Sequence, residues 1–220
     1  MFEEIIKKVI KHEGGYANHP DDRGGETYKG VSRVNWPDWD GWEIIDNIKK
    51  KAEDHTEFLN KLRNNKELDE LIIKFYKINF WRKIKADKFD REIAYILFDT
   101  AVNMGTGRAV MILQDTYNKV TPDNHISVDG IVGPQTIGAV NKADREHIII
   151  GYISGRIQRY FDIIDNNNSQ KVFLRGWMNR MVRIILQIYG RNQPEKKEEG
   201  YSISEITKAL ERLLRAELGG

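Results

Sequence analysis

The apolar residues of this sequence recur at helical spacing along most of its length, and this spacing restricts the fold more than any other feature. The first helical face is formed by Phe2, Ile5, Ile6, Val9 and Ile10, which follow the i, i+3, i+4, i+7 pattern. Residues 90–104 are apolar nearly all round, as expected of a buried central helix. Strand signals are scarce, and the best candidate is Thr27 to Ser32. The sequence therefore predicts a mainly α fold with a small β-ribbon.

The other helices are separated by turn-forming residues. They are predicted over residues 43–64, 66–80, 108–120, 144–164 and 170–189. Asn64-Asn65, Gly105 and the run from Asn166 to Ser169 mark three of the breaks. Another helix is predicted to begin at Pro134, because proline suits the first helical turn. No internal repeat interrupts this succession of helices.

Composition excludes several classes of protein. The 220 residues include no cysteine, which excludes disulfides, thiolate catalysis and Cys-based zinc sites. A net charge of +2 argues against a nucleic-acid binder, which usually has a strongly basic face. No stretch approaches the roughly 18 apolar residues of a membrane span, so stable membrane insertion is not expected. The first 13 residues lack an apolar h-region, and we expect synthesis in the cytoplasm without a signal peptide.

The C-terminal residues form a separate segment in the sequence. Residues 191–200 read as a charged linker, and residues 201–220 as an amphipathic helix that opens with a capping box at Ser202 and Glu205. Two interpretations remain open for that helix. It packs on the main body or on a partner, or it is a membrane-active or targeting helix.

Glu13 is the first candidate catalytic residue. It lies four residues after Val9 and three after Ile10, so it continues the apolar stripe and is expected to point into the protein. Burial and the negative end of the helix dipole both favour a protonated carboxyl group. Such a group can act as general acid toward a glycosidic oxygen. The alternative is a solvated residue at a frayed helix end, with Gly14 as a simple C-cap.

Several motifs, in order along the chain, resemble those of the glycoside hydrolase family 108 lysozymes. The first run comprises Glu13-Gly14-Gly15-Tyr16, Asn18-His19-Pro20, Asp22, Gly24-Gly25, Thr27 and Gly30. The second comprises Phe98-Asp99, Val102-Asn103 and Gly105. The third resembles the associated peptidoglycan-binding region and comprises Asp129-Gly130, Gly133-Pro134, Thr136, Arg159-Tyr160, Gly176-Trp177 and Asn179-Arg180. The resemblance covers residues 2–190 approximately.

This resemblance implies an N-acetylmuramidase with a lysozyme-like helical fold and a β-ribbon beside the active-site helix. Residues 1–105 would form the catalytic region and residues 106–190 the helical peptidoglycan-binding region. Glu13 would be the catalytic acid, and Asp22 and Thr27 are the candidates to hold or activate water on the opposite face of the sugar, since glycoside hydrolysis needs two opposed groups. Tyr16 and Tyr28 are candidate substrate contacts. No cofactor is implied, and peptidoglycan is the expected partner.

The sequence departs from the family pattern at two positions. Arg23 stands where the family commonly has proline, and Glu26 where it commonly has a small residue. Glu26 adds a carboxylate close to the expected cleft. It is either an accessory base or a solvated surface charge, and the second interpretation is favoured.

Three further groups have alternative interpretations. Tyr95, Asp99 and Asn103 recur at i, i+4, i+8; they form either part of a saccharide-binding floor or a buried hydrogen-bond network. Trp36, Trp39 and Trp42 either stack on sugar rings or form a small satellite core. An arginine set (Arg156, Arg159, Arg175, Arg180 and Arg183) either binds an anionic polymer or is solvated and ion-paired. The spacing of His12, His19 and Asp22 matches no metal site, so none is predicted.

The function predicted from these features is hydrolysis of the β-1,4 bond between N-acetylmuramic acid and N-acetylglucosamine. Two rival classes stay open: a non-catalytic peptidoglycan-binding module, and a structural protein of a phage particle. The expected setting is an endolysin that reaches the wall after holin-type release, or a lysin carried on a phage-like particle. The oligomeric state does not follow from the sequence.

Overall fold

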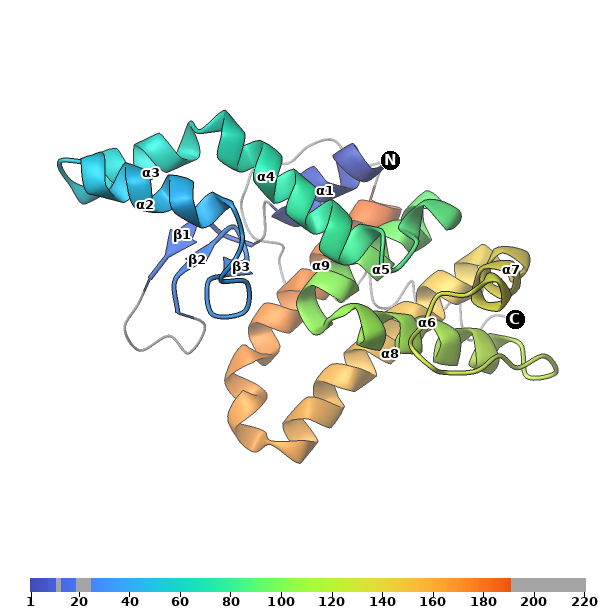
Figure 1. Ribbon diagram of the computed structural model, residues 1–220. Helices are drawn as coiled ribbons and strands as arrows, with labels where there is room; N and C mark the ends of the chain where they lie inside the picture. Colours follow the sequence, from blue (N-terminus) through green and yellow to red (C-terminus); the bar gives the residue numbers. More distant parts are fainter. Residues whose placement is uncertain (11–12, 19–24, 191–220) are drawn as a thin grey trace. The chain divides into compact units, whose positions relative to one another are not determined.

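The computed structural model describes residues 1–10, 13–18 and 25–190 (Figure 1). These residues form two compact units, one over Met1–Asp87 and one that begins at Lys88. The linker and amphipathic helix predicted over residues 191–220 lie outside the described residues, as do His12, His19 and Asp22.

The first unit combines helices with a small sheet (Figure 1). Its elements are α1 (Phe2–Ile10), β1 (Tyr16–Ala17), β2 (Thr27–Tyr28), β3 (Val31–Ser32), α2 (Gly41–Lys51), α3 (His55–Arg63) and α4 (Lys66–Tyr76). A π-helical turn (Lys77–Trp81) and a 3₁₀ turn (Ala86–Lys88) follow α4. On α1, the buried residues are Phe2, Ile5, Ile6 and Val9, which confirms the predicted apolar face. Helix α2 packs against α3 and α4.

The sheet is antiparallel in the order β1-β2-β3. Ala17 pairs with Thr27, and Tyr28 pairs with Val31. Between β2 and β3 stand only Lys29 and Gly30, both with positive φ, at 44° and 82°. A two-residue hairpin loop with both residues at positive φ is a type I′ turn, whose twist matches that of the strands. The predicted ribbon over Thr27 to Ser32 is thus confirmed, and β1 adds a third strand to it.

The single helix predicted over residues 43–64 is wrong, because the chain breaks between α2 and α3. The Glu57 amide donates to Asp54 Oδ1 at 2.8 Å, and the Glu57 carboxylate accepts from the Glu53 amide at 2.6 Å. These two bonds form a variant of the capping box, in which the Glu57 carboxylate accepts from the amide before the N-cap residue Asp54. The break was therefore readable from the Asp54–Glu57 spacing.

The second unit is helical. Its elements are α5 (Arg91–Met104), α6 (Thr106–Val120), α7 (Pro134–Lys142), α8 (Arg145–Asn166), a 3₁₀ turn (Asn168–Phe173) and α9 (Leu174–Tyr189). Helix α5 packs against α6 and α8, while α9 packs against α8. Residues Ile93–Ala101 of α5 are all buried, which confirms the expected central helix. The start at Pro134 is also confirmed, and the first part of the predicted helix at 170–189 is 3₁₀ instead.

The mainly α, lysozyme-like fold class with a small sheet is confirmed. Among the helices that the structure describes, none combines the length and the apolar content needed to span a bilayer.

Candidate active site

Glu13 lies just beyond the first helix, at the start of the sheet region. The described part of α1 ends at Ile10, and the Glu13 amide donates to the Ile10 carbonyl at 3.0 Å. The Glu13 side chain is half-buried, whereas Gly14 and Gly15 are exposed. Gly14 has φ 78°, a left-handed conformation that glycine adopts without strain. The carboxyl group is therefore held at the surface of the first unit and not in free solvent.

The β2–β3 turn approaches Glu13 closely at Gly30. A Cβ built on Gly30 would lie 3.2 Å from Glu13 Oε2 and 3.1 Å from Glu13 Cβ. The same Cβ would collide with the hydroxyl of Tyr76. Gly30 is thus required twice, for its positive φ and for the space that it leaves. Its lack of a side chain lets the turn form one wall beside the Glu13 carboxyl group.

Helix α4 fixes this turn at two points. The Tyr76 hydroxyl donates to the Lys29 carbonyl at 2.8 Å, and Lys29 Nζ lies 2.6 Å from Asp69 Oδ1. Burial lowers the pKa of Lys29, but the hydrogen bond and charge of Asp69 outweigh burial and raise that pKa above its ordinary value. The ammonium group is therefore charged at neutral pH. Tyr76 is 1% exposed, so the wall beside Glu13 is anchored to the core.

Glu26 is not the solvated surface charge that was expected. Its side chain is 12% exposed, and its Oε2 lies 2.7 Å from Arg33 Nε. Its Oε1 accepts from the Tyr16 hydroxyl at 2.6 Å and lies 3.7 Å from Lys49 Nζ. Two cations and a phenol compensate its charge, which is why a carboxylate is tolerated there. The expectation was wrong because these partners come from strands and a helix that the local sequence does not connect.

Arg33 extends this cluster to α2. Its two terminal nitrogens contact Asp46 in a bidentate pair, with Nη2–Oδ1 at 2.7 Å and Nη1–Oδ2 at 3.0 Å. The hydrogen bond with Arg33 lowers the pKa of Asp46, against a smaller opposing effect of burial. The guanidinium also lies over the Trp42 ring, 4.5 Å from its centroid. The cluster therefore ties β3 to α2.

The two tyrosines predicted to contact substrate occupy different environments. Tyr16 is half-buried, and burial, followed by its bond to Glu26, raises its pKa. Tyr28 is 2% exposed, donates to the Leu62 carbonyl at 3.2 Å and stacks on Trp39. Tyr28 is thus a core residue. Thr27, half-buried, points to the opposite face of the sheet from Tyr28.

The three tryptophans form a small satellite core, which was one of the two interpretations. Trp42 is 3% exposed, and its ring meets that of Trp39 edge-on at 5.2 Å. Trp36 meets Phe75 edge-on at 4.9 Å, and the Trp42 indole donates to the Trp36 carbonyl at 2.8 Å. Aromatic pairs in this geometry contribute about 0.5–1.5 kcal/mol beyond their buried area. These rings therefore stabilise the segment that follows the sheet.

In the second unit, Asp99 is the centre of a buried ion network. It is 1% exposed, and its Oδ1 lies 2.7 Å from Arg156 Nη1 and 2.9 Å from Arg180 Nε. Arg156 also donates to the Thr100 hydroxyl at 3.0 Å. Burial raises the pKa of Asp99, but the two guanidinium groups outweigh burial and hold that pKa below its usual value. Asp99 joins α5 to α8 and α9, as expected for a buried hydrogen-bond network.

The other two residues of the polar line predicted on α5 flank Asp99. Tyr95 is 6% exposed, and burial raises its pKa. Asn103 is exposed, and its Oδ1 accepts from the Tyr160 hydroxyl at 2.8 Å. Of the polar line predicted on this helix, Asn103 is thus the residue whose surface a ligand can reach.

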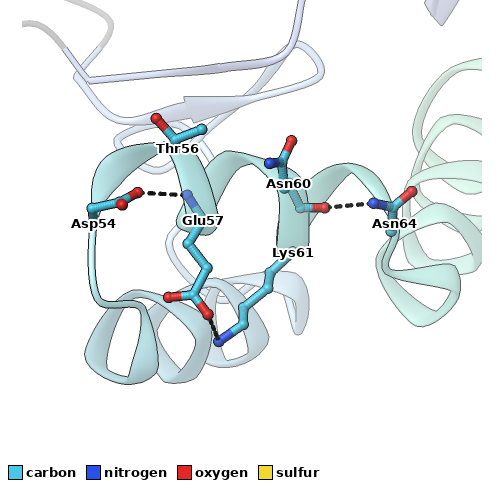
Figure 2. Close-up of a pocket in the computed structure, with 6 residues that line it drawn as sticks. All are labelled: Asp54, Thr56, Glu57, Asn60, Lys61 and Asn64. Atoms are coloured by element: carbon cyan, nitrogen blue, oxygen red, sulfur yellow. Dashed lines mark hydrogen bonds and ion pairs between the residues drawn. The ribbon is translucent and has the colours of Figure 1, made fainter.

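A hollow of the first unit lies along α3 and does not have the chemistry of a catalytic site. It measures about 450 Å³, and Figure 2 shows its lining residues, Asp54, Thr56, Glu57, Asn60, Lys61 and Asn64. Most of their polar groups already serve α3: Asp54 caps it, Glu57 and Lys61 form an ion pair at 2.7 Å, and Asn64 donates to the Asn60 carbonyl. We assign this hollow no role.

Sequence reasoning did not identify Tyr76, Lys29 and Asp69 as residues of this site. Tyr76 and Lys29 stand 47 positions apart, and no local pattern links them. Gly30 was part of the motif, but its contact with Glu13 is visible only in the structure.

Comparisons with known proteins agree with this architecture. A family model described as Glycosyl hydrolase 108 matches residues 6–105, and a model described as Predicted Peptidoglycan domain matches residues 108–182. The resemblance drawn from the motifs is therefore confirmed over both segments. No curated protein matches the sequence. Among solved structures, SagA of Brucella abortus aligns with a TM-score of 0.61 at 23% identity, covering 88% of this chain and 97% of that one. At this identity the likeness shows a shared fold.

Proposed function

We infer that this protein is a lysozyme-type glycoside hydrolase that degrades peptidoglycan, because its sequence matches the glycosyl hydrolase 108 and predicted peptidoglycan domain models. Within this class, we propose that it cleaves the β-1,4 bond between N-acetylmuramic acid and N-acetylglucosamine, with Glu13 as general acid. Residues 1–105 supply catalysis and residues 106–190 hold the wall. The spans of the two family models support this division, although α5 packs with the helices of the second compact unit.

The observation that carries the proposal is the position of Glu13. Its half-buried carboxyl group lies against the Gly30 turn, and α4 holds that turn through Tyr76 and Asp69. A general acid must be held still relative to the bond that it protonates, because misplacement by about 1 Å can cost 10²-fold in rate. The turn supplies this rigidity on one side of the carboxyl group.

In the proposed reaction, Glu13 donates its proton to the glycosidic oxygen. The bond from that oxygen to the sugar C1 breaks, its electron pair stays on the leaving oxygen, and positive charge develops at C1 and the ring oxygen. Water then adds to C1 and loses a proton to a base. We assign Asp22 and Thr27 to holding or activating this water, and Tyr16 to contacting the sugar. The support for these three roles is the motif resemblance, with Thr27 and Tyr16 on neighbouring strands.

The test is Glu13→Gln, which keeps the size of the side chain and removes its acidity. Activity on purified peptidoglycan should fall by at least about 10²-fold, the lower range for loss of a general acid. Mass analysis of the wild-type products should show new reducing ends on muramic acid, each gaining one water. Free amino groups among the products would indicate an amidase or peptidase. Products lighter by one water would mean that a sugar hydroxyl, and not water, attacks C1.

The rival functions give different outcomes in the same experiment. A non-catalytic wall-binding module would sediment with peptidoglycan and release nothing, with or without Glu13. A structural protein of a phage particle would form stable oligomers and leave the wall intact. We further propose that the chain reaches the wall after holin-type release or on a phage-like particle. Expression with and without a holin, followed by turbidity, tests this route.

A further inference from the structure

The second unit contains a hollow of about 300 Å³ at the junction of four helices. It lies where α5 ends and α6 begins, and α8 and α9 complete it. The residues that matter here are Asn103, Arg108, Arg159, Tyr160, Ile163 and Trp177. All belong to the second unit, and none takes part in the chemistry assigned to Glu13.

The apolar part of the hollow is built on a stacked aromatic pair. The Trp177 ring lies 4.8 Å from the Tyr160 ring with an interplanar angle of 12°. Tyr160 is 1% exposed, whereas Trp177 is half-buried. The buried Tyr160 ring therefore holds one face of the indole in place, and Ile163 extends the apolar surface. A half-exposed aromatic ring held in this way is a preorganised contact for aliphatic groups or sugar faces.

The polar part of the hollow offers hydrogen-bond donors. Asn103 Oδ1 already accepts from the Tyr160 hydroxyl at 2.8 Å and from Arg156 Nη2 at 3.4 Å. The amide NH₂ is the group that Asn103 has left for a ligand. Arg108 is exposed and has no ion pair with any described residue, and the only ion pair of Arg159 with a described residue is a long one, with Asp162 at 4.0 Å. The rim is thus electropositive.

The start of α6 adds to this positive potential. The helix begins at Thr106 after Gly105, whose lack of a side chain leaves the first amides without a side-chain cap. The N-terminal end of a helix has partial positive charge. A Cβ at Gly105 or Gly107 would meet nothing within 4 Å, so the backbone there is open to a ligand. Two guanidinium groups, an amide and this helix end together suit a carboxylate beside an aliphatic or sugar group.

We propose that this hollow binds a carboxylate of the peptide stem of peptidoglycan, with Arg108 and Arg159 as its cationic ligands and Trp177 against the adjoining aliphatic chain. The inference rests on the proposed function for its choice of polymer. The glycan backbone has no charge to match two arginines, since N-acetylglucosamine is neutral and the lactyl carboxyl of muramic acid is amide-linked where a stem is attached. The stems carry the free carboxylates.

The test measures binding to the full chain with Glu13→Gln, so that no ligand is cleaved. Calorimetry should show binding of a stem-bearing muropeptide and at least tenfold weaker binding of the same compound with amidated carboxylates, because hydrogen bonds to charged groups are stronger than those between neutral groups. Arg108→Gln and Arg159→Gln should each weaken binding of the carboxylate form about tenfold and leave binding of the amidated form unchanged. The matched control is Arg175→Gln, an exposed arginine of α9 that does not line the hollow, and it should bind as the parent does.

Three results would overturn the assignment. Equal affinity for carboxylate and amidated ligands would show that the carboxylate is not the group that is recognised. Normal binding by both arginine variants and by Trp177→Ala would show that the hollow is not the binding site. Tighter binding of a poly(glycerol phosphate) through the same arginines would replace the peptide stem by a phosphate polymer. Failure of the proposed function gives a different result. If the chain with Glu13 intact released no glycan while muropeptide binding still depended on Arg108, the binding site would be supported and the hydrolase activity refuted.

Discussion

Replacement of Gly30 by alanine tests whether the β2–β3 turn holds Glu13 in place. At φ 82°, a residue with a Cβ is strained by about 1–2 kcal/mol, and the lower entropy of the unfolded alanine chain offsets about 0.4–1 kcal/mol of this. The new methyl group also collides with the Tyr76 hydroxyl and presses on Glu13 Oε2, and overpacking of this kind costs about 1–3 kcal/mol. We expect a loss of about 2–4 kcal/mol in the free energy of unfolding.

Gly14→Ala is the matched control for stability. Gly14 has nearly the same φ, 78°, but a Cβ there would meet nothing within 4 Å. It should therefore show the backbone strain alone, a loss of about 1 kcal/mol or less. A double variant, Gly30→Ala with Tyr76→Phe, removes the hydroxyl that the methyl group strikes. Its loss should be smaller than the sum of the two single losses, because the residues are in contact.

Urea unfolding gives the free energies, and release of reducing sugar from peptidoglycan gives the activity. Gly30→Ala should lower the melting temperature by about 5–15 °C, from about 2–4 °C per kcal/mol for a chain of this size. Activity at a temperature where the variant is folded should fall about tenfold or more, since the methyl group displaces the Glu13 carboxyl group. If Gly30→Ala were as stable and as active as wild type, the turn would not position Glu13 and the reasoning would be refuted.

Two further predictions concern the cores of the two units. Asp99→Asn should destabilise the protein by about 3–5 kcal/mol, because Arg156 is left buried without its counter-charge. The folded pKa of Asp99 lies below the unfolded value of about 3.9, so wild-type stability should be lost as pH falls below about 4. In calorimetry, the melting temperature of Asp99→Asn should therefore fall less steeply with decreasing pH than that of the wild type. Equal slopes would contradict this. Gly41→Ala places a methyl group in the Trp39 ring and should lower the free energy of unfolding by about 1–3 kcal/mol, although alanine favours helices. Tryptophan fluorescence should report the displaced ring. An unchanged spectrum together with unchanged stability would contradict this packing.

Much of the fold follows from local patterns in the sequence. Helix α1 was predictable because burial of one face imposes the 3.6-residue period on its apolar residues. Helix α5 was predictable because a central helix is apolar on all sides, and α7 because proline suits a first helical turn. The break before α3 was missed, although Asp54 and Glu57 have the spacing of a capping box. Strand β1 has two residues, Tyr16 and Ala17, and a strand that short shows no alternation to detect.

The site was predictable only in part, because its contacts are long-range. Glu13 could be proposed from the apolar stripe and the motifs. The compensation of Glu26 by Arg33 and Lys49 could not, since charge pairing between separate elements leaves no periodic signal. The same holds for Asp99, whose partner Arg156 is 57 positions away. Spacing on α5 placed Asp99 on a polar line, but only its partners distinguish a buried ion pair from a binding surface.

The dependence of the β2–β3 turn on α4 also sets an order of assembly. Strands of two residues form too few hydrogen bonds to persist alone, so the turn should become ordered only when the Tyr76 hydroxyl is present to donate its hydrogen bond to the Lys29 carbonyl. Glu13 is thus translated early and positioned late, after a loop of more than 40 residues has closed. In pulse-labelled hydrogen exchange, the Lys29 amide, bonded to the Gly15 carbonyl at 2.9 Å, should gain protection together with the amides of α4. Protection of Lys29 before α4 would show that the sheet forms independently of α4.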